Sequence, residues 1–126
     1  LSRPDDSDVV IRPVPSGPPE RTTWVLSRPT ATTAAIKVRL DPAAVDPPQR
    51  VHVGHDWFFV LEGRVLLLLG ERRINVEAGQ AAEFDTMTPH AFTAVGGPAE
   101  VIMLFDRDGQ RAHAHGEGGA HSPARP

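Results

Sequence analysis

RVHVGHDWFFVLEG, residues 50–63, is the stretch that decides the fold expected for this 126-residue chain. Its first half is polar and passes through a turn signal at Gly54, whereas residues 57–61 are apolar at every position. A short apolar run bounded by turn residues is typical of a β-strand that is covered on both faces. His52 and Asp56 precede this run, so they lie where a pocket inside a β-barrel would need polar groups.

Outward from this stretch, the chain continues as short strands separated by turn residues. Residues 34–40 alternate with a period of two, and residues 65–69 form a second fully apolar run. Further strands are expected, between glycine- and proline-marked turns, over residues 73–76, 81–84, 90–95 and 100–105. No window of twelve or more residues shows a helical period. Eight or nine short strands therefore predict an all-β sandwich or jelly-roll barrel.

Composition divides the chain into three parts. Residues 1–20 are polar and proline-rich, which indicates an extended N-terminal arm with a short strand over residues 9–12. Residues 21–106 would form the barrel, and residues 107–126, rich in glycine, would form a flexible tail. The two fully apolar strands need cover on their outer faces from a partner chain or from the arm, so we expect a homodimer.

Charge and cysteine content limit the classes of function. The net charge is −3, without the basic patch usual in nucleic-acid-binding domains, so this chain itself is not expected to bind nucleic acid. The absence of cysteine excludes disulfides, a thiolate nucleophile and cysteine-bound zinc. The apolar runs are too short to span a bilayer, and no signal-peptide pattern opens the chain. A cytoplasmic protein with no membrane partner is therefore expected.

Three residues could hold a divalent metal ion. On a strand over residues 50–53, His52 would face the barrel interior, Asp56 would enter from the next strand, and His90 from a third. Two nitrogen ligands and one oxygen ligand with open positions suit an exchangeable or catalytic ion. His55, in the turn, is expected to face solvent.

Arg50 would share the interior face with His52 and changes the expected chemistry. A guanidinium is always charged and never ligates a metal ion, so it would repel a cation. It would bind a carboxylate or phosphate through a bidentate contact instead. The alternative is that Asp56 pairs with Arg50 or a histidine in a pocket that contains only water or an organic ligand. The expected ligand-binding set is Arg50, His52, Asp56 and His90.

The spacing of these residues resembles the two motifs of the cupin superfamily. The first motif has two histidines separated by one residue, an acidic residue four positions later and a glycine seven positions after that. The matching positions are Arg50, His52, Asp56 and Gly63, and the second motif is matched by Gly79 and His90. The resemblance implies a jelly-roll β-barrel, or double-stranded β-helix, with a metal ion at His52, Asp56 and His90. Arg50 departs from the pattern because it replaces the first histidine ligand.

A narrower resemblance concerns residues 55–63, 82–90 and 109–113. These phrases resemble the C-terminal cupin sensor half of XRE-type helix-turn-helix transcriptional regulators. The resemblance implies a domain that binds a small effector, with a DNA-binding part outside this chain, and the start at Leu1 agrees with a piece of a longer protein. No residue is then expected to be catalytic. The alternatives are a small metal-dependent cupin enzyme, dioxygenase- or isomerase-like, and a purely structural dimerisation domain.

Overall fold

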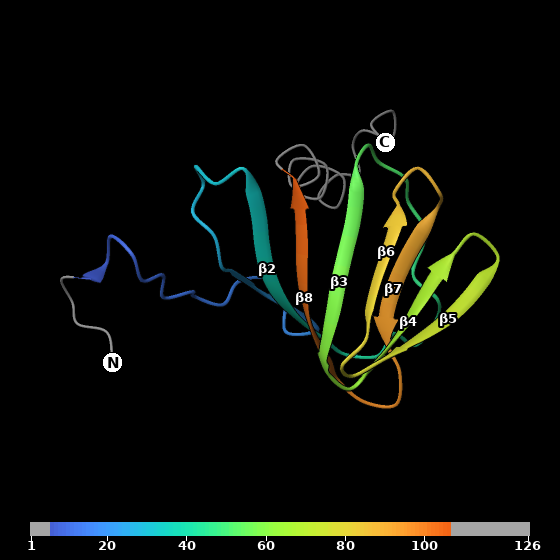
Figure 1. The fold of residues 1–126 in the computed structure, drawn as a ribbon. Helices are drawn as coiled ribbons and strands as arrows, with labels where there is room; N and C mark the ends of the chain where they lie inside the picture. The colour runs from blue at the N-terminus through green and yellow to red at the C-terminus, as the bar shows by residue number, and fades with distance from the viewer. Residues whose placement is uncertain (1–5, 107–126) are drawn as a thin grey trace.

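Two antiparallel sheets enclose the core in the computed structural model, which describes residues 6–106 (Figure 1). One sheet has five strands in the order β1-β2-β8-β3-β6, and the other has three in the order β5-β4-β7. The strands are β1 (Arg21–Val25), β2 (Thr33–Leu40), β3 (His55–Glu62), β4 (Arg64–Leu69), β5 (Arg72–Glu77), β6 (Ala81–Asp85), β7 (His90–Ala94) and β8 (Ala99–Asp106). The predicted all-β jelly-roll fold is confirmed. No helix among the described residues is long and apolar enough to cross a membrane.

The sequence prediction differs from the structure at three strands. β1 was not predicted, because its sequence RTTWV has no apolar alternation. The strand expected over residues 9–12 is wrong: the carbonyl of Asp6 accepts hydrogen bonds from the amides of Val9 and Val10, which makes a turn. The strand expected over residues 50–53 is reduced to a single bridge between Arg50 and His90. The expected flexible tail, residues 107–126, lies outside the described residues.

Alternating side chains of both sheets fill the core. On β3 the side chains of Asp56, Phe58 and Val60 are buried, whereas the intervening Trp57 and Phe59 are half-buried. The buried hydrophobic residues are Ala34, Val38, Leu40, Phe58, Val60, Val65, Leu67, Leu68, Val76, Phe84, Ala94, Ala99, Val101, Met103 and Phe105. Burial of each large apolar side chain stabilises the fold by about 1.5–3 kcal/mol. A single chain thus covers the inner face of β3 completely and its outer face only in part.

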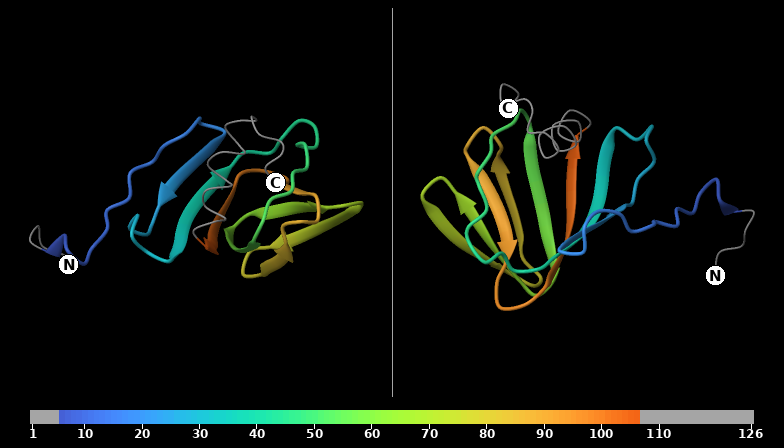
Figure 2. Two further views of the ribbon diagram at one scale, coloured as in Figure 1. Left: turned by 90° about the horizontal axis from the view of Figure 1, so that it is seen from above. Right: turned by 180° about the vertical axis from the view of Figure 1, so that it is seen from behind.

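A long connection between β2 and β3, residues 41–54, leaves the five-stranded sheet, runs along β7 of the three-stranded sheet and returns to the five-stranded sheet (Figure 2). Its backbone is fastened at three points to β7 and to the turn before it. The amide of Ala43 donates to Thr93 Oγ1 at 3.0 Å, and Arg50 exchanges two backbone hydrogen bonds with His90. The amide of His52 donates to the carbonyl of Thr86 at 3.0 Å. This irregular segment is therefore held in one place although it forms no strand.

The turn between β3 and β4 depends on Gly63. Its φ of +81° lies in the left-handed region, which favours glycine, and a Cβ there would be 2.5 Å from the carbonyl oxygen of Pro98. Gly79 also has a positive φ, +88°, but a Cβ there would meet nothing within 4 Å. A side chain at Gly79 would therefore meet backbone strain alone, whereas a side chain at Gly63 would meet both backbone strain and steric overlap.

Gly63→Ala is expected to lower the free energy of unfolding by about 2–5 kcal/mol, since left-handed strain and overpacking add together. Gly79→Ala should cost about 1–2 kcal/mol, from the strain alone. Urea denaturation followed by tryptophan fluorescence measures both values. Equal losses for the two variants would contradict the close packing of the β3–β4 turn against Pro98.

Candidate metal centre

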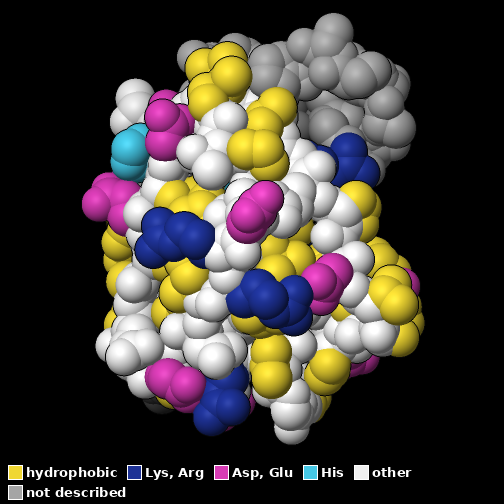
Figure 3. Space-filling model, turned by 90° about the vertical axis from the view of Figure 1, so that its right-hand side faces the viewer, with side chains coloured by type: hydrophobic (Ala, Val, Ile, Leu, Met, Phe, Trp, Pro, Cys, Tyr) yellow, Lys and Arg dark blue, Asp and Glu magenta, His cyan; other side chains and the backbone are white. Residues whose placement is uncertain are grey.

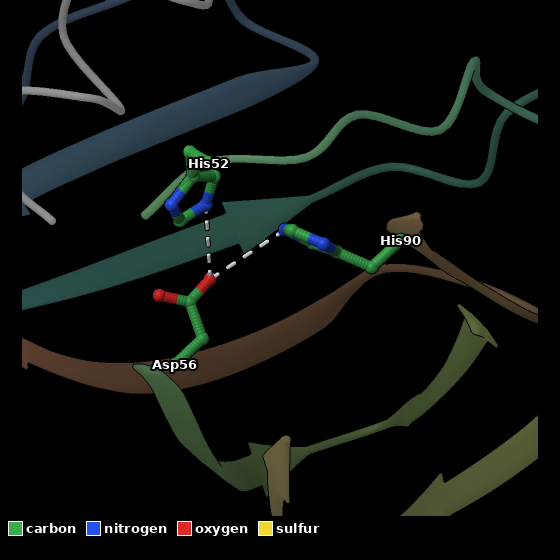
Figure 4. A group of neighbouring side chains, drawn as sticks. All are labelled: His52, Asp56 and His90. Atoms are coloured by element: carbon green, nitrogen blue, oxygen red, sulfur yellow. Dashed lines mark ion pairs between the residues drawn. The ribbon is translucent and has the colours of Figure 1, made fainter. Parts of the chain in front are cut away.

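His52, Asp56 and His90 come together at one end of the barrel interior (Figure 4). His52 lies on the connection before β3, Asp56 is the first inward-facing residue of β3, and His90 begins β7. Their exposed fractions are 6%, 0% and 6%. One carboxylate oxygen, Asp56 Oδ2, lies 3.7 Å from His52 Nε2 and 3.8 Å from His90 Nε2. The structure therefore brings together the three residues that the sequence indicated as metal ligands.

The other ring nitrogen of each histidine is occupied by a backbone carbonyl. His90 Nδ1 lies 2.9 Å from the carbonyl oxygen of Thr88, and His52 Nδ1 lies 3.3 Å from that of Val53. A carbonyl only accepts hydrogen bonds, so each Nδ1 must carry the proton. In the neutral tautomer, each Nε2 then directs a lone pair toward the Asp56 carboxylate. Three electron-rich atoms that face one another require a cation between them, either a proton or a metal ion.

The dimensions of the centre suit a metal ion. Two ligand atoms that each lie about 2.1 Å from one ion can be at most about 4.2 Å apart. The two Nε2–Oδ2 distances of 3.7 and 3.8 Å satisfy this limit. All three ligand atoms lie within 4.8 Å of one another, so the two imidazole nitrogens need to approach each other by at most about 0.6 Å to satisfy it as well. Imidazole nitrogens oriented by a carbonyl on the far side of the ring are the usual arrangement around bound metals. The residues present therefore fit one divalent ion.

Thr86 positions His52, and sequence reasoning missed it. Its side chain is fully buried, and its hydroxyl lies 2.6 Å from the carbonyl oxygens of both His52 and Gly54. The hydroxyl has one proton, so it donates to one of these carbonyls at a time. Continuing the alternation of Ala82 and Phe84 on β6 would have placed Thr86 on the inner face. That signal was available in the sequence, but threonine is not itself a metal ligand in this pattern.

Aromatic rings close one side of the centre. The ring of Phe84 lies 5.2 Å from that of His90, and the two imidazoles lie 5.0 Å apart, edge to face. Phe58 continues this layer, 6.4 Å from Phe84. Apolar walls lower the local dielectric, so the Asp56 carboxylate interacts more strongly with any cation beside it.

Arg50 does not share the buried position of His52. It is exposed, whereas the sequence predicted that both side chains would face the interior. The prediction assumed a regular strand, and the segment pairs with β7 only at Arg50 itself. The backbone of Arg50 nevertheless pairs with that of His90, one of the three candidate ligands. His55 faces solvent as predicted, at the start of β3 and 3.8 Å from Glu83.

Comparison with known proteins agrees with this architecture. A family model for the cupin domain matches residues 36–105. KdgF from Halomonas sp. is 23% identical, with a TM-score of 0.63, over 75% of this chain and 87% of that one. The hydroxypropylphosphonic acid epoxidase from S. wedmorenis is 21% identical, with a TM-score of 0.65, over 83% of this chain and 58% of that one. A crystal structure of FeII HppE gives 21% identity and a TM-score of 0.63, again over 83% and 58%.

Each structure is less than 25% identical to this chain, so the similarity shows the fold alone. The chain spans 58% of the length of the epoxidase. No curated protein sequence matches the chain.

Divalent ions are expected to raise the melting temperature of chelator-treated, untagged protein. An ion at 100 times its dissociation constant stabilises the folded state by about 2.7 kcal/mol. His52→Ala and His90→Ala should each weaken binding by about 100-fold or more, since each removes one ligand. Differential scanning fluorimetry with Fe(II), Mn(II), Co(II), Ni(II) and Zn(II) measures the shift.

His55→Ala is the matched control, because this exposed histidine lies next to Asp56 on β3 and should leave the shift unchanged. If His55→Ala reduced the metal-induced shift in melting temperature as much as His52→Ala does, the ion would bind at the surface and not at the buried centre. If no ion shifted the melting temperature of the unmodified protein, the prediction of a metal centre would be wrong.

Proposed function

Because the chain belongs to the cupin family, we propose that its barrel holds one divalent metal ion and binds a small anionic molecule beside it. The observation that carries this proposal is the convergence of two Nε2 atoms on one buried carboxylate oxygen. Three protein ligands leave positions open for a further molecule. When bound, such an ion supplies an electrophilic site for an oxygen atom of that molecule.

The charges around the centre favour an anion. A divalent ion contributes two positive charges, the Asp56 carboxylate offsets one, and the neutral imidazoles offset none. Arg50 adds a further fixed positive charge on the segment that pairs with His90. A guanidinium that reached from Arg50 toward the ion would suit a carboxylate, phosphate or phosphonate group.

We further propose that this chain is the effector-binding sensor domain of an XRE-type transcriptional regulator. The resembling phrases 55–63 and 82–90 include Asp56, Thr86 and His90, so they lie around the centre itself. The third phrase, 109–113, lies outside the described residues. The described residues, 6–106, contain no α-helix, so a helix-turn-helix would require other residues. Effector binding would shift a dimer between two arrangements of such parts.

An enzyme is the second candidate, and the donor set favours it. Two histidines and one carboxylate with open positions are the ligands of non-haem Fe(II) oxygenases. The epoxidase and FeII HppE share this fold. A dioxygenase- or isomerase-like reaction would then take place at His52, Asp56 and His90.

Turnover separates the two candidates. Fe(II)-loaded protein would be incubated in air with a panel of small carboxylates and phosphonates, with oxygen consumption and mass spectrometry as readouts. A sensor is expected to return each bound compound unchanged and to consume no more oxygen than Asp56→Asn. Catalytic conversion that Asp56→Asn abolishes would establish the enzyme and contradict the sensor.

Arg50→Gln is expected to weaken the binding of a small carboxylate probe, such as succinate or 2-oxoglutarate, by about 10- to 100-fold, because a charge-assisted contact contributes about 1.5–3 kcal/mol. Metal affinity should stay the same or rise, since a positive charge is removed. Arg72→Gln, at the exposed start of β5, is the control and should bind like the unmodified protein. Isothermal titration of the metal-loaded proteins tests this. Unchanged carboxylate affinity in Arg50→Gln would exclude Arg50 from the ligand site.

A further inference from the structure

The outer face of the five-stranded sheet carries a group of apolar side chains. Directly paired residues of an antiparallel sheet project from the same face. Trp57 pairs with Leu104, Phe59 pairs with Ile102, and Ala35 on β2 also pairs with Leu104. All five are half-buried or exposed, whereas their neighbours along β3 and β8 are buried. We call Ala35, Trp57, Phe59, Ile102 and Leu104 the outer strip.

Charged side chains border apolar ones on both sides of the molecule, but in the outer strip the apolar group is continuous across three strands. On the side that carries β4 and β5, hydrophobic patches are interrupted by Lys, Arg, Asp and Glu side chains (Figure 3). The outer strip runs across β2, β8 and β3, and two charged residues on the same face border it: Lys37, which pairs with Ile102, and Glu83, which pairs with Trp57. Grouped apolar side chains that include a tryptophan and a phenylalanine are typical of an interaction surface.

The N-terminal arm, residues 6–15, also exposes apolar side chains. It leaves the barrel beyond β1 and extends away from both sheets (Figures 1 and 2). Its inner end is fastened by the Ser16–Thr23 bridge, and Arg28 Nη2 donates to the carbonyl of Ser7 at 2.9 Å. Val9 and Val14 are each 75% exposed. The arm thus presents apolar side chains that its own barrel does not cover.

We infer that the outer strip of one chain binds the N-terminal arm of a second copy, so that two chains exchange arms reciprocally in a dimer. The arm is long enough: residues 6–9 form a turn, and the six residues that follow, 10–15, reach about 20 Å when extended. Five strands spaced about 4.8 Å apart span about 19 Å. An arm can therefore cross the whole sheet of its partner.

The chemistry of the arm suits this face. Pro13 and Pro15 lack amide protons and fix the backbone in an extended form, so the arm cannot become an interior strand. Docking on the face of a sheet needs no backbone pairing. Extended proline-rich segments bind aromatic surfaces because little conformational entropy remains to be lost. Trp57 and Phe59 provide such a surface, and the arm's direction away from its own sheet favours a partner's strip.

Cysteine cross-linking tests the contact, because the chain has no cysteine of its own. Val14→Cys and Leu104→Cys chains with different tags would be co-expressed and oxidised. A disulfide between the two chains is expected. The control pairs Leu104→Cys with Val45→Cys, which is 78% exposed on the connection before β3 and should form little cross-linked product. Equal cross-linking of the control pair would overturn the proposal.

The double variant Val14→Cys/Leu104→Cys distinguishes exchange from folding back. Exchange predicts chains that migrate as a covalent dimer on a non-reducing gel. An intrachain disulfide in a monomer would show that the arm covers its own sheet and would contradict the inference.

The oligomeric state provides an independent measurement on the full chain. Light scattering is expected to show a dimer, and Val14→Asp should raise its dissociation constant at least tenfold. Val45→Asp, an equally exposed change outside the arm, should leave the dimer intact. Urea denaturation would verify that both variants are folded. A monomeric unmodified protein, or a dimer indifferent to Val14→Asp, would overturn the proposal.

Discussion

The fully buried carboxylate of Asp56 is the constraint on which the centre depends. Removing a charged carboxylate from water costs several kcal/mol unless a positive charge and hydrogen-bond donors compensate. The two imidazoles direct Nε2 lone pairs toward Asp56, so the compensation must come from a proton or a metal ion held between these atoms. A metal ion or a shared proton is therefore part of the balance of forces that keeps this end of the barrel intact.

The centre is assembled from segments with different degrees of order. Asp56 and His90 lie on β3 and β7, where the sheet ladders determine their positions. His52 lies on an irregular connection, and backbone contacts with Thr86 and β7 replace the missing ladder. The two sheet-borne ligands would form the fixed part of the centre.

Strand β3 links the two surfaces to which we assign binding. Asp56 and Phe58 point into the barrel, while Trp57 and Phe59 belong to the outer strip. A shift of β3 on ligand binding inside the barrel would therefore also move Trp57 and Phe59 on the outer face. This arrangement agrees with the proposed role as a sensor, in which a small molecule inside the barrel biases the arrangement of two chains.

The sequence by itself determined the all-β architecture, most of the strands and the three metal-ligand candidates. Alternation, turn residues and motif spacing are local signals, and each strand reports its own inner and outer faces. The tertiary structure alone decided that Arg50 is exposed, that residues 50–53 form no strand, and that Thr86 positions His52. These features depend on contacts between distant residues: the Thr86 hydroxyl and the His52 carbonyl are 34 positions apart. No local pattern encodes a hydrogen bond across that separation, because its partners meet only after the sheets have packed.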